Sequence, residues 1–274
     1  MQEKSPLKEM HFTTKSMFTT VNIGQIPYLN CEPFFNGLNL DGINLCPMVP
    51  SAMGPLAETG ELDAAPFSLI QSFGLTDEYE TLGDMGISVK GAVRSILLYS
   101  KMPLKELSGS TIGVTQESAT SSQLLRVILE TKYDIHPYKY VDLSDKTSSA
   151  FLLIGDQALG THDRVPGFDY RYDLSEEWFE WHRLPFVFAR WMVLKSLDTN
   201  EKDTLSNKLI SNLNRNMAGD LSDIISKRES MNMEPGGIEN YLRAFRYIFS
   251  EEDQKAIEVF EQAWNGLRNL EETL

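Results

Sequence analysis

Cysteine is scarce in this sequence, since only Cys31 and Cys46 occur among 274 residues and they do not form a CxxC pair. A disulfide framework or a structural zinc site needs more cysteines at closer spacing, so neither is indicated. The histidines stand at positions 11, 136, 162 and 182, too far apart for two of them to share one turn of a helix. We therefore predict free thiols and no metal, while contact between the two cysteines stays open.

Long hydrophobic runs are also missing. No segment approaches the roughly 20 apolar residues that a membrane span needs, and the N-terminal residues 1–20 contain no apolar core of the kind found in signal peptides. These residues are polar and lack periodicity, so we expect a flexible leader before a fold that begins near Val21. The sequence thus predicts a cytoplasmic protein that does not associate with membranes.

Positive charge is in deficit, with a formal net charge of −14 at pH 7. Because like charges oppose approach, nucleic acid is not an expected partner. An anion can still bind in a local pocket, where helix N-termini, hydroxyl groups and a few cations hold a carboxylate. We expect a small-molecule partner, and the sequence does not predict the oligomeric state.

The familiar catalytic motifs are absent as well. The chain has no GxSxG elbow, no HExxH pair, no Walker loop and no GxGxxG after a strand. Metal-dependent hydrolysis, nucleotide binding and triad chemistry are therefore not indicated, and we predict no cofactor.

The pattern that is present is an alternation of short apolar strands with helices. Predicted strands cover residues 21–26, 43–49, 62–66, 95–100, 110–114, 138–141 and 151–155. Helices are expected near Pro33, from Pro50 to Gly60, and after Ser118, where apolar residues recur at helical spacing. This rhythm predicts an α/β fold with parallel βαβ units.

We expect two lobes, one inserted in the other. Residues 21–107 and 185–274 would form the first lobe, and residues 108–184 the second. The tail from Leu197 onward is expected to be helical, and its apolar residues at helical spacing are interpreted as core packing. Those residues are Tyr241, Phe245, Ile248 and Phe249.

Candidate site residues stand where the predicted strands end, at the expected mouth of an open α/β sheet. Asn30 follows the first strand, Ser68 follows the third, and Arg94 and Ser95 open the strand that runs to residue 100. A hydroxyl-rich cluster from Ser118 to Ser122 begins a helix. Such a cluster suits a carboxylate, although from spacing alone these residues are more typical of plain helix caps. The residues alone indicate a cleft for a small polar anion.

Five ordered segments resemble one known family, the chorismate dehydratases of menaquinone biosynthesis (the MqnA family). The Ile26-Pro27-Tyr28-Leu29-Asn30 segment, with Pro33 following, and the segment leading from Leu184-Pro185-Phe186 into Val187-Phe188-Ala189 are the most specific. The other three run from Gly91 to Ser100, from Glu117 to Ser122 and from Ile154 to Leu159. Together they span about 160 residues of the chain.

The resemblance implies a two-lobed type II periplasmic-binding-protein fold with a central ligand cleft. It also implies dehydration of chorismate to 3-[(1-carboxyvinyl)oxy]benzoate on the futalosine route, without a cofactor. Asn30 and Ser95 would lie at the reacting part of the substrate, and Thr120, Ser121 and Ser122 would hold a carboxylate from the other lobe. No general base is evident, and a carboxylate of the substrate is a hypothetical proton acceptor.

Some positions depart from the family pattern. His182 and Arg183 replace a usual Thr-Gly pair, Ala92 replaces a proline, and Arg190 replaces a small or apolar residue. Asp156 matches the family but is expected to be structural. Two alternatives stay open, a 1,4-dihydroxy-6-naphthoate synthase-like enzyme and a non-catalytic protein that binds or senses a small anion.

Overall fold

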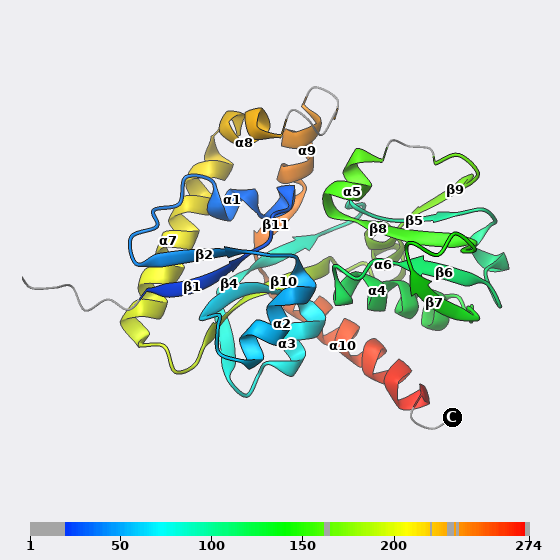
Figure 1. Ribbon diagram of the computed structural model, residues 1–274, viewed down its shortest axis with the longest axis horizontal. Coiled ribbons are helices and arrows are strands. Elements are labelled where there is room, and N and C mark those ends of the chain that lie inside the picture. The colour runs from blue at the N-terminus through cyan, green and yellow to red at the C-terminus, as the bar shows by residue number, and fades with distance from the viewer. Residues whose placement is uncertain (1–19, 162–164, 220, 229–232, 234–235, 272–274) are drawn as a thin grey trace, which may run out of the picture.

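The computed structural model describes residues 20–161, 165–219, 221–228, 233 and 236–271. Two β-sheets, each flanked by helices, form two lobes that lie side by side (Figure 1). The predicted leader lies outside the described residues except for Thr20, as do the histidines at positions 11 and 162.

The first lobe is built on a six-stranded sheet in the order β11-β4-β10-β3-β1-β2. Its strands are β1 (Val21–Gln25), β2 (Ile43–Pro47), β3 (Ala64–Ser68), β4 (Tyr79–Val89), β10 (Phe186–Leu194) and β11 (Phe245–Ile248). Its helices are η1 (Leu29–Cys31), α1 (Glu32–Phe35), α2 (Pro50–Glu58), α3 (Leu69–Gly74), α7 (Thr199–Ala218), α8 (Ser222–Lys227), α9 (Gly237–Arg243) and α10 (Glu251–Glu271). The first three strands are parallel, as predicted, whereas β10 is antiparallel to both of its neighbours.

The second lobe is built on a five-stranded sheet in the order β7-β6-β8-β5-β9. Its strands are β5 (Ile96–Ser100), β6 (Thr111–Val114), β7 (Lys139–Asp142), β8 (Ala150–Ile154) and β9 (Tyr170–Asp173). Its helical segments are η2 (Leu104–Glu106), α4 (Ala119–Arg126), the π-helical turn η3 (Val127–Lys132), α5 (Gly155–Gly160) and α6 (Leu174–His182). Strands β6, β7 and β8 are parallel, and β5 runs antiparallel to β8 and β9.

The predicted lobe boundary between residues 107 and 108 is wrong for strand β5. All five residues of β5 are buried, and the strand pairs with β8 and β9 in the second sheet. A continuous apolar run indicates a buried strand but does not indicate which sheet it joins, because it has no polar face. The chain crosses between the two sheets after Val89 and returns before Phe186.

The tail is less uniformly helical than predicted. Phe245 to Ile248 form strand β11 at the edge of the first sheet, and Ile248 is 48% exposed rather than packed in the core. The other predicted core residues of this segment, Tyr241, Phe245 and Phe249, are buried. Helical spacing is ambiguous over four residues, so pairing with β4 decides the outcome here.

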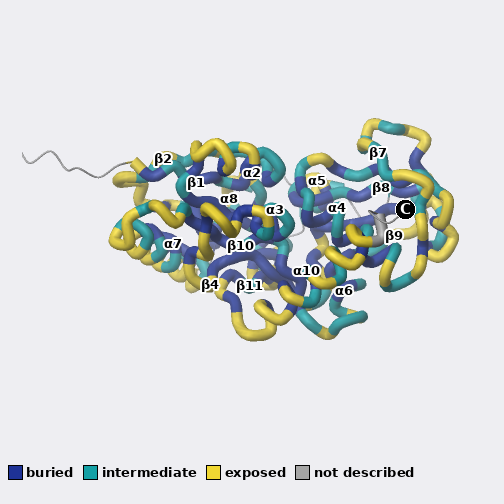
Figure 2. Tube along the Cα trace, turned by 90° about the horizontal axis from the view of Figure 1, so that it is seen from below, coloured by how far each residue is buried: buried dark blue, intermediate teal, exposed yellow. Residues whose placement is uncertain are grey.

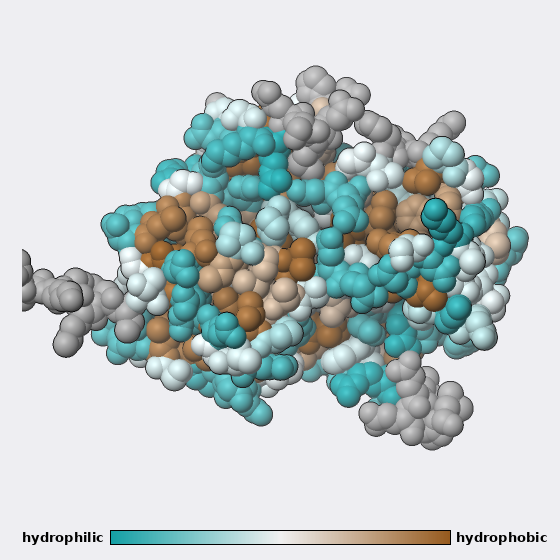
Figure 3. Space-filling model, viewed as in Figure 1, coloured by the Kyte–Doolittle hydropathy of each residue, from teal (hydrophilic) through white to brown (hydrophobic). Residues whose placement is uncertain are grey.

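Buried side chains run through both lobes, and Figure 2 shows the central strands of each sheet as largely buried. Helix α10 contacts β10 of the first lobe and η3 of the second, so it braces both. Figure 3 shows polar residues over much of one face, with apolar residues gathered in the region of β1 and β2 in Figure 1 and in smaller groups elsewhere. Among the described helices, none has the length and apolar character that crossing a bilayer requires.

Candidate functional site

A narrow cavity of about 50 Å³ lies between the two lobes. The carboxyl ends of parallel strands from both sheets meet there, which is where open α/β sheets place ligands. Its lining comes from both lobes and from the crossing segments: Ile26, Tyr28, Asn30, Cys31, Pro50, Ser68, Ile87, Val93, Ser95, Ile96, Ser118, Ser121, Ile154, Gly155, Phe188 and Ala189.

Both predicted catalytic residues lie at this cavity. Asn30 is placed by η1, directly after β1, and its Oδ1 atom is buried without a hydrogen-bond partner among the described residues. Ser95 precedes β5 and is 2% exposed, and its Oγ accepts a hydrogen bond of 2.8 Å from the Tyr241 hydroxyl. Burying an amide oxygen without a hydrogen-bond partner destabilises the folded protein, so a polar group that enters the cavity and donates to Asn30 Oδ1 would bind favourably.

Three of the predicted binding serines also line the cavity. Ser118 caps α4 by accepting from Ser121 N at 3.4 Å, and the two hydroxyls lie 3.3 Å apart. Ser68 ends β3 and donates to Gln71 Oε1 at 3.1 Å. The cap interpretation of Ser118 is therefore correct, and the same geometry brings the positive end of the α4 dipole to the cavity, where it favours an anion.

The remaining three predicted binding residues do not line the cavity. Arg94 is exposed with a φ of 63°, and its backbone N–H donates to Asp173 Oδ2 at 2.6 Å. Thr120 is buried, but its hydroxyl accepts from Ile70 N at 3.0 Å and so joins the lobes instead. The Ser122 hydroxyl donates to the backbone carbonyls of Thr115 and Ser118, at the start of its own helix. Adjacent positions on a helix point in different directions, so Ser122 does not share the face on which Ser121 meets the cavity. The structure thus places these three residues outside the cavity lining.

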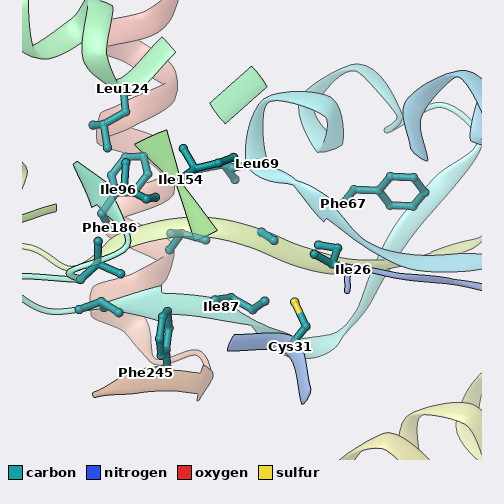
Figure 4. Packing of buried hydrophobic residues seen from close by; sticks show 14 of the residues in the cluster. Ile26, Cys31, Phe67, Leu69, Ile87, Ile96, Leu124, Ile154, Phe186 and Phe245 are labelled. Carbon is teal, nitrogen blue, oxygen red and sulfur yellow. The ribbon is translucent and has the colours of Figure 1, made fainter. Parts of the chain in front are cut away.

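The cavity wall is mainly aliphatic and carries no formal charge. Figure 4 shows Ile26, Ile87, Ile96 and Ile154 converging from ribbons of both lobes, with the Cys31 thiol among them. None of the described residues that line it is an Asp, Glu, His, Lys or Arg. Burial raises the pKa of Cys31 well above its usual value, so this thiol is neutral. Both cysteines are free, as predicted.

A contact missed from the sequence joins the two lobes at Tyr28, which lines the cavity. The Tyr28 hydroxyl of the first lobe donates to Glu117 of the second, and Gln157 Nε2 donates to the other oxygen of Glu117 at 3.0 Å. Burial, followed by the Glu117 carboxylate, raises the pKa of Tyr28, so the phenol keeps its proton. The Tyr28 ring lies over Gly155, where a Cβ atom would come within 3.1 Å of the ring and where φ is +55°. Only glycine suits that position.

Asp156 joins the lobes, as its expected structural role implies. It accepts from Leu29 N at 3.0 Å and pairs with Arg228 at 3.1 Å, and Arg228 also pairs with Glu32 at 2.5 Å. Burial raises the pKa of Asp156, while the Leu29 amide and Arg228 oppose that rise. Since Leu29 is adjacent to Asn30, this network fixes the backbone that carries the amide.

Sequence comparison identifies the family. A family model described as menaquinone biosynthesis matches residues 21–265. The chain belongs to this menaquinone biosynthesis family. A chorismate dehydratase from Thermus thermophilus is 28% identical over 262 residues, covering 88% of this chain and 94% of that protein. The family resemblance drawn from the sequence motifs is confirmed.

Solved structures share the fold. A protein from Archaeoglobus fulgidus matches with a TM-score of 0.67 at 16% identity, covering 90% of this chain and 97% of its own. The alkanesulfonate-binding protein SsuA from Xanthomonas axonopodis pv. citri, bound to MOPS, matches with a TM-score of 0.59 at 11% identity, covering 90% and 93%. The predicted two-lobed periplasmic-binding-protein fold is thereby confirmed.

The unusual pair in this family member, His182 and Arg183, ends α6 away from the cavity lining. Arg183 adopts a left-handed conformation at the helix end, with a φ of 58°. The His182 ring lies against Trp178 and Trp181, with ring centroids 4.2 Å and 4.1 Å away. Its Nε2 atom is buried with no hydrogen-bond partner among the described residues. The pair thus belongs to the packing of α6.

We expect His182 to make this protein less stable in acid. Burial, and then the Lys132 charge, lower the pKa of His182 below its usual 6.5. The unfolded chain therefore binds a proton that the folded chain resists, and stability is lost as pH falls below about 6.5. Urea unfolding at pH 7.5 and 5.5 should show that the free energy of unfolding falls less between these two pH values for His182→Gln than for the wild type. The exposed His136 provides the control, and an equal effect of His136→Gln contradicts the prediction.

Proposed function

We propose that this protein is a chorismate dehydratase, a hydro-lyase that converts chorismate to 3-[(1-carboxyvinyl)oxy]benzoate and water in menaquinone biosynthesis via futalosine. The observation that carries the proposal is the cavity between the lobes, with an unpaired Asn30 amide oxygen, four serines and an aliphatic wall. Membership of the menaquinone biosynthesis family and the 28% identical Thermus thermophilus chorismate dehydratase support it.

The lining suits the chemistry of this substrate. Chorismate presents a six-membered unsaturated ring, which apolar side chains such as Ile87, Ile154 and Phe188 contact favourably. Its two carboxylates and one hydroxyl need hydrogen-bond donors and acceptors, which the serines, Asn30 and the α4 N-terminus offer. Since no Asp, Glu, His or Lys is among the described lining residues, the carboxylates of the substrate are the bases available there.

The reaction balances without a redox partner. The C3–H bond breaks and its electron pair forms the new ring double bond, while the C4–O bond breaks and hydroxide leaves. The proton removed from C3 converts that hydroxide to water, and the ring becomes aromatic. We propose that a carboxylate of the substrate carries the proton, because Glu117 is already held by Tyr28 and Gln157. The protein then needs chiefly to orient the substrate and to stabilise the departing oxygen.

Incubation of the purified protein with chorismate tests the proposal. We expect chromatography to show loss of chorismate and formation of the carboxyvinyloxybenzoate, at a rate well above that of chorismate in buffer alone. A chorismate analogue without the enolpyruvyl carboxylate should bind but not react. Binding of chorismate without turnover would instead favour a sensor, and no binding would favour another substrate such as that of the naphthoate synthase.

We also propose that the enzyme works in the cytoplasm. Both cysteines are free thiols, and the reactive part of Cys31 is buried at the cavity. Unpaired thiols are typical of a reducing compartment. Fractionation of cells that produce the protein, followed by immunodetection, locates it.

A further inference from the structure

The Tyr241 hydroxyl is a polar group in the core with a single described partner at the cavity. Tyr241 lies on α9, in the C-terminal part of the first lobe, and is 3% exposed. Its hydroxyl lies 2.8 Å from Ser95 Oγ, and Ser95 is itself 2% exposed and lines the cavity. No other described residue forms a hydrogen bond with the Tyr241 hydroxyl. Tyr241 therefore reaches the cavity only through Ser95.

The direction of this hydrogen bond follows from what each partner has available. A phenol carries one proton, and leaving that proton unpaired in the core is costly. Burial also raises the pKa of Tyr241, so the phenol stays protonated. With Ser95 as its acceptor, Tyr241 satisfies its only proton. The hydroxyl of Ser95 then keeps its own proton for another acceptor.

No described residue accepts a hydrogen bond from Ser95 Oγ, which faces a cavity lined by both lobes. The backbone of Ser95 is fixed as well, because its carbonyl accepts from Gly155 N at 2.8 Å. The Ser95 side chain is thus fixed by the hydrogen bond from the Tyr241 phenol, and its backbone by the hydrogen bond from Gly155 of the second lobe. Its remaining freedom is to donate toward the cavity.

We propose that Tyr241 is a positioning residue, which holds Ser95 as a hydrogen-bond donor to an oxygen of the bound substrate. This inference rests on the proposed dehydratase function, in which the oxygen belongs to the departing hydroxyl or to a carboxylate. In a hydrogen-bond chain each donor strengthens the next, so the phenol also makes the Ser95 proton a better donor. Charge that develops on the departing oxygen is then stabilised more than the ground state is.

Four variants test this arrangement: Tyr241→Phe, Ser95→Ala, the double variant, and Tyr247→Phe as a matched control. Tyr247 is also a buried tyrosine of the same segment, but its hydroxyl has no hydrogen-bond partner among the described residues. We expect Tyr241→Phe to lower kcat about 10-fold with KM changed less, and Ser95→Ala to lower it about 100-fold. The double variant should equal Ser95→Ala alone, and Tyr247→Phe should match the wild type.

Independent losses would overturn the inference. Tyr241 does not act through Ser95 if Tyr241→Phe keeps at least half of the wild-type kcat. The same conclusion follows if the fold-decrease in kcat of the double variant equals the product of the two single fold-decreases. If the wild type does not turn over chorismate, the proposed function fails separately. In that case crystal structures decide: we expect the Ser95 side chain to change rotamer in Tyr241→Phe but not in Tyr247→Phe, and an unchanged rotamer overturns the positioning role.

Discussion

Asn30→Ala should lower kcat/KM for chorismate by about 100-fold, while the free energy of unfolding stays the same or rises slightly. This combination of effects is unusual for a buried polar residue. It is expected here because the Asn30 Oδ1 atom is buried at the cavity without a described partner. Removing an unsatisfied polar group relieves a desolvation cost instead of breaking an interaction.

The loss of activity has the opposite origin. A substrate hydroxyl that donates to Asn30 Oδ1 fills the pairing that the folded protein lacks, and the alanine variant offers nothing in its place. Asn30 is also held firmly in place, because the amide of neighbouring Leu29 donates to Asp156 of the second lobe. An amide fixed in this way loses little entropy when the substrate binds.

Asn212 offers a matched control. This asparagine is buried, its Nδ2 donates to Phe34 O at 2.8 Å and to Asn36 O at 3.2 Å, and it does not line the cavity. Asn212→Ala should therefore lose stability by about 1–3 kcal/mol and keep its kcat/KM. Urea unfolding and steady-state kinetics on both variants check whether Asn30→Ala loses activity but not stability and Asn212→Ala loses stability but not activity. Asn30 is not a substrate contact if Asn30→Ala loses stability but retains activity.

Polar contacts hold the two lobes together. Contacts that cross between them include Tyr28 with Glu117, Leu29 and Arg228 with Asp156, and Ile70 with Thr120. A substrate the size of chorismate needs a route to Asn30 and Ser95, so these contacts must open and re-form during turnover. These contacts are hydrogen bonds and one ion pair between polar groups, which can exchange their partners for water.

Parts of this architecture were predictable because they depend on local sequence. Asn30 and Ser68 lie at the cavity because the parallel strands β1 and β3 end there, and Ser95 lies there because it stands at the start of β5. The Ser118 cap was predictable for the same reason. In each of these cases a short segment determines the position of its own side chain.

Other parts depend on partners far away in the chain. Arg94 was misplaced because its backbone adopts a φ of 63°, which directs the side chain to solvent and which no neighbouring residue announces. Strand β5 was placed in the wrong sheet because burial on both faces does not select a partner. Tyr241 was predicted only as core packing, and its contact with Ser95 spans 146 positions. No local pattern encodes such a pairing.

Trp178→Ala should cause the largest loss of stability among the substitutions considered, about 3–5 kcal/mol. Trp178 lies on α6 and is fully buried. Its ring packs against Phe186 of β10 and Phe260 of α10, with centroids 5.4 Å and 5.8 Å away, and its Nε1 donates to Pro185 O at 3.0 Å. These partners stand where the chain returns to the first lobe, so the cavity left by alanine would loosen the junction between the lobes.

Two further substitutions separate packing from hydrogen bonding. Trp178→Phe keeps an aromatic ring but loses the bond to Pro185, so we expect it to lose less stability than the alanine variant. Trp264→Ala, on α10, removes a half-buried ring stacked 5.8 Å from Phe73 and should cost less still. Urea unfolding followed by far-UV circular dichroism ranks the three. If Trp264→Ala costs more than Trp178→Ala, the junction at α6 is not the main packing link between the lobes.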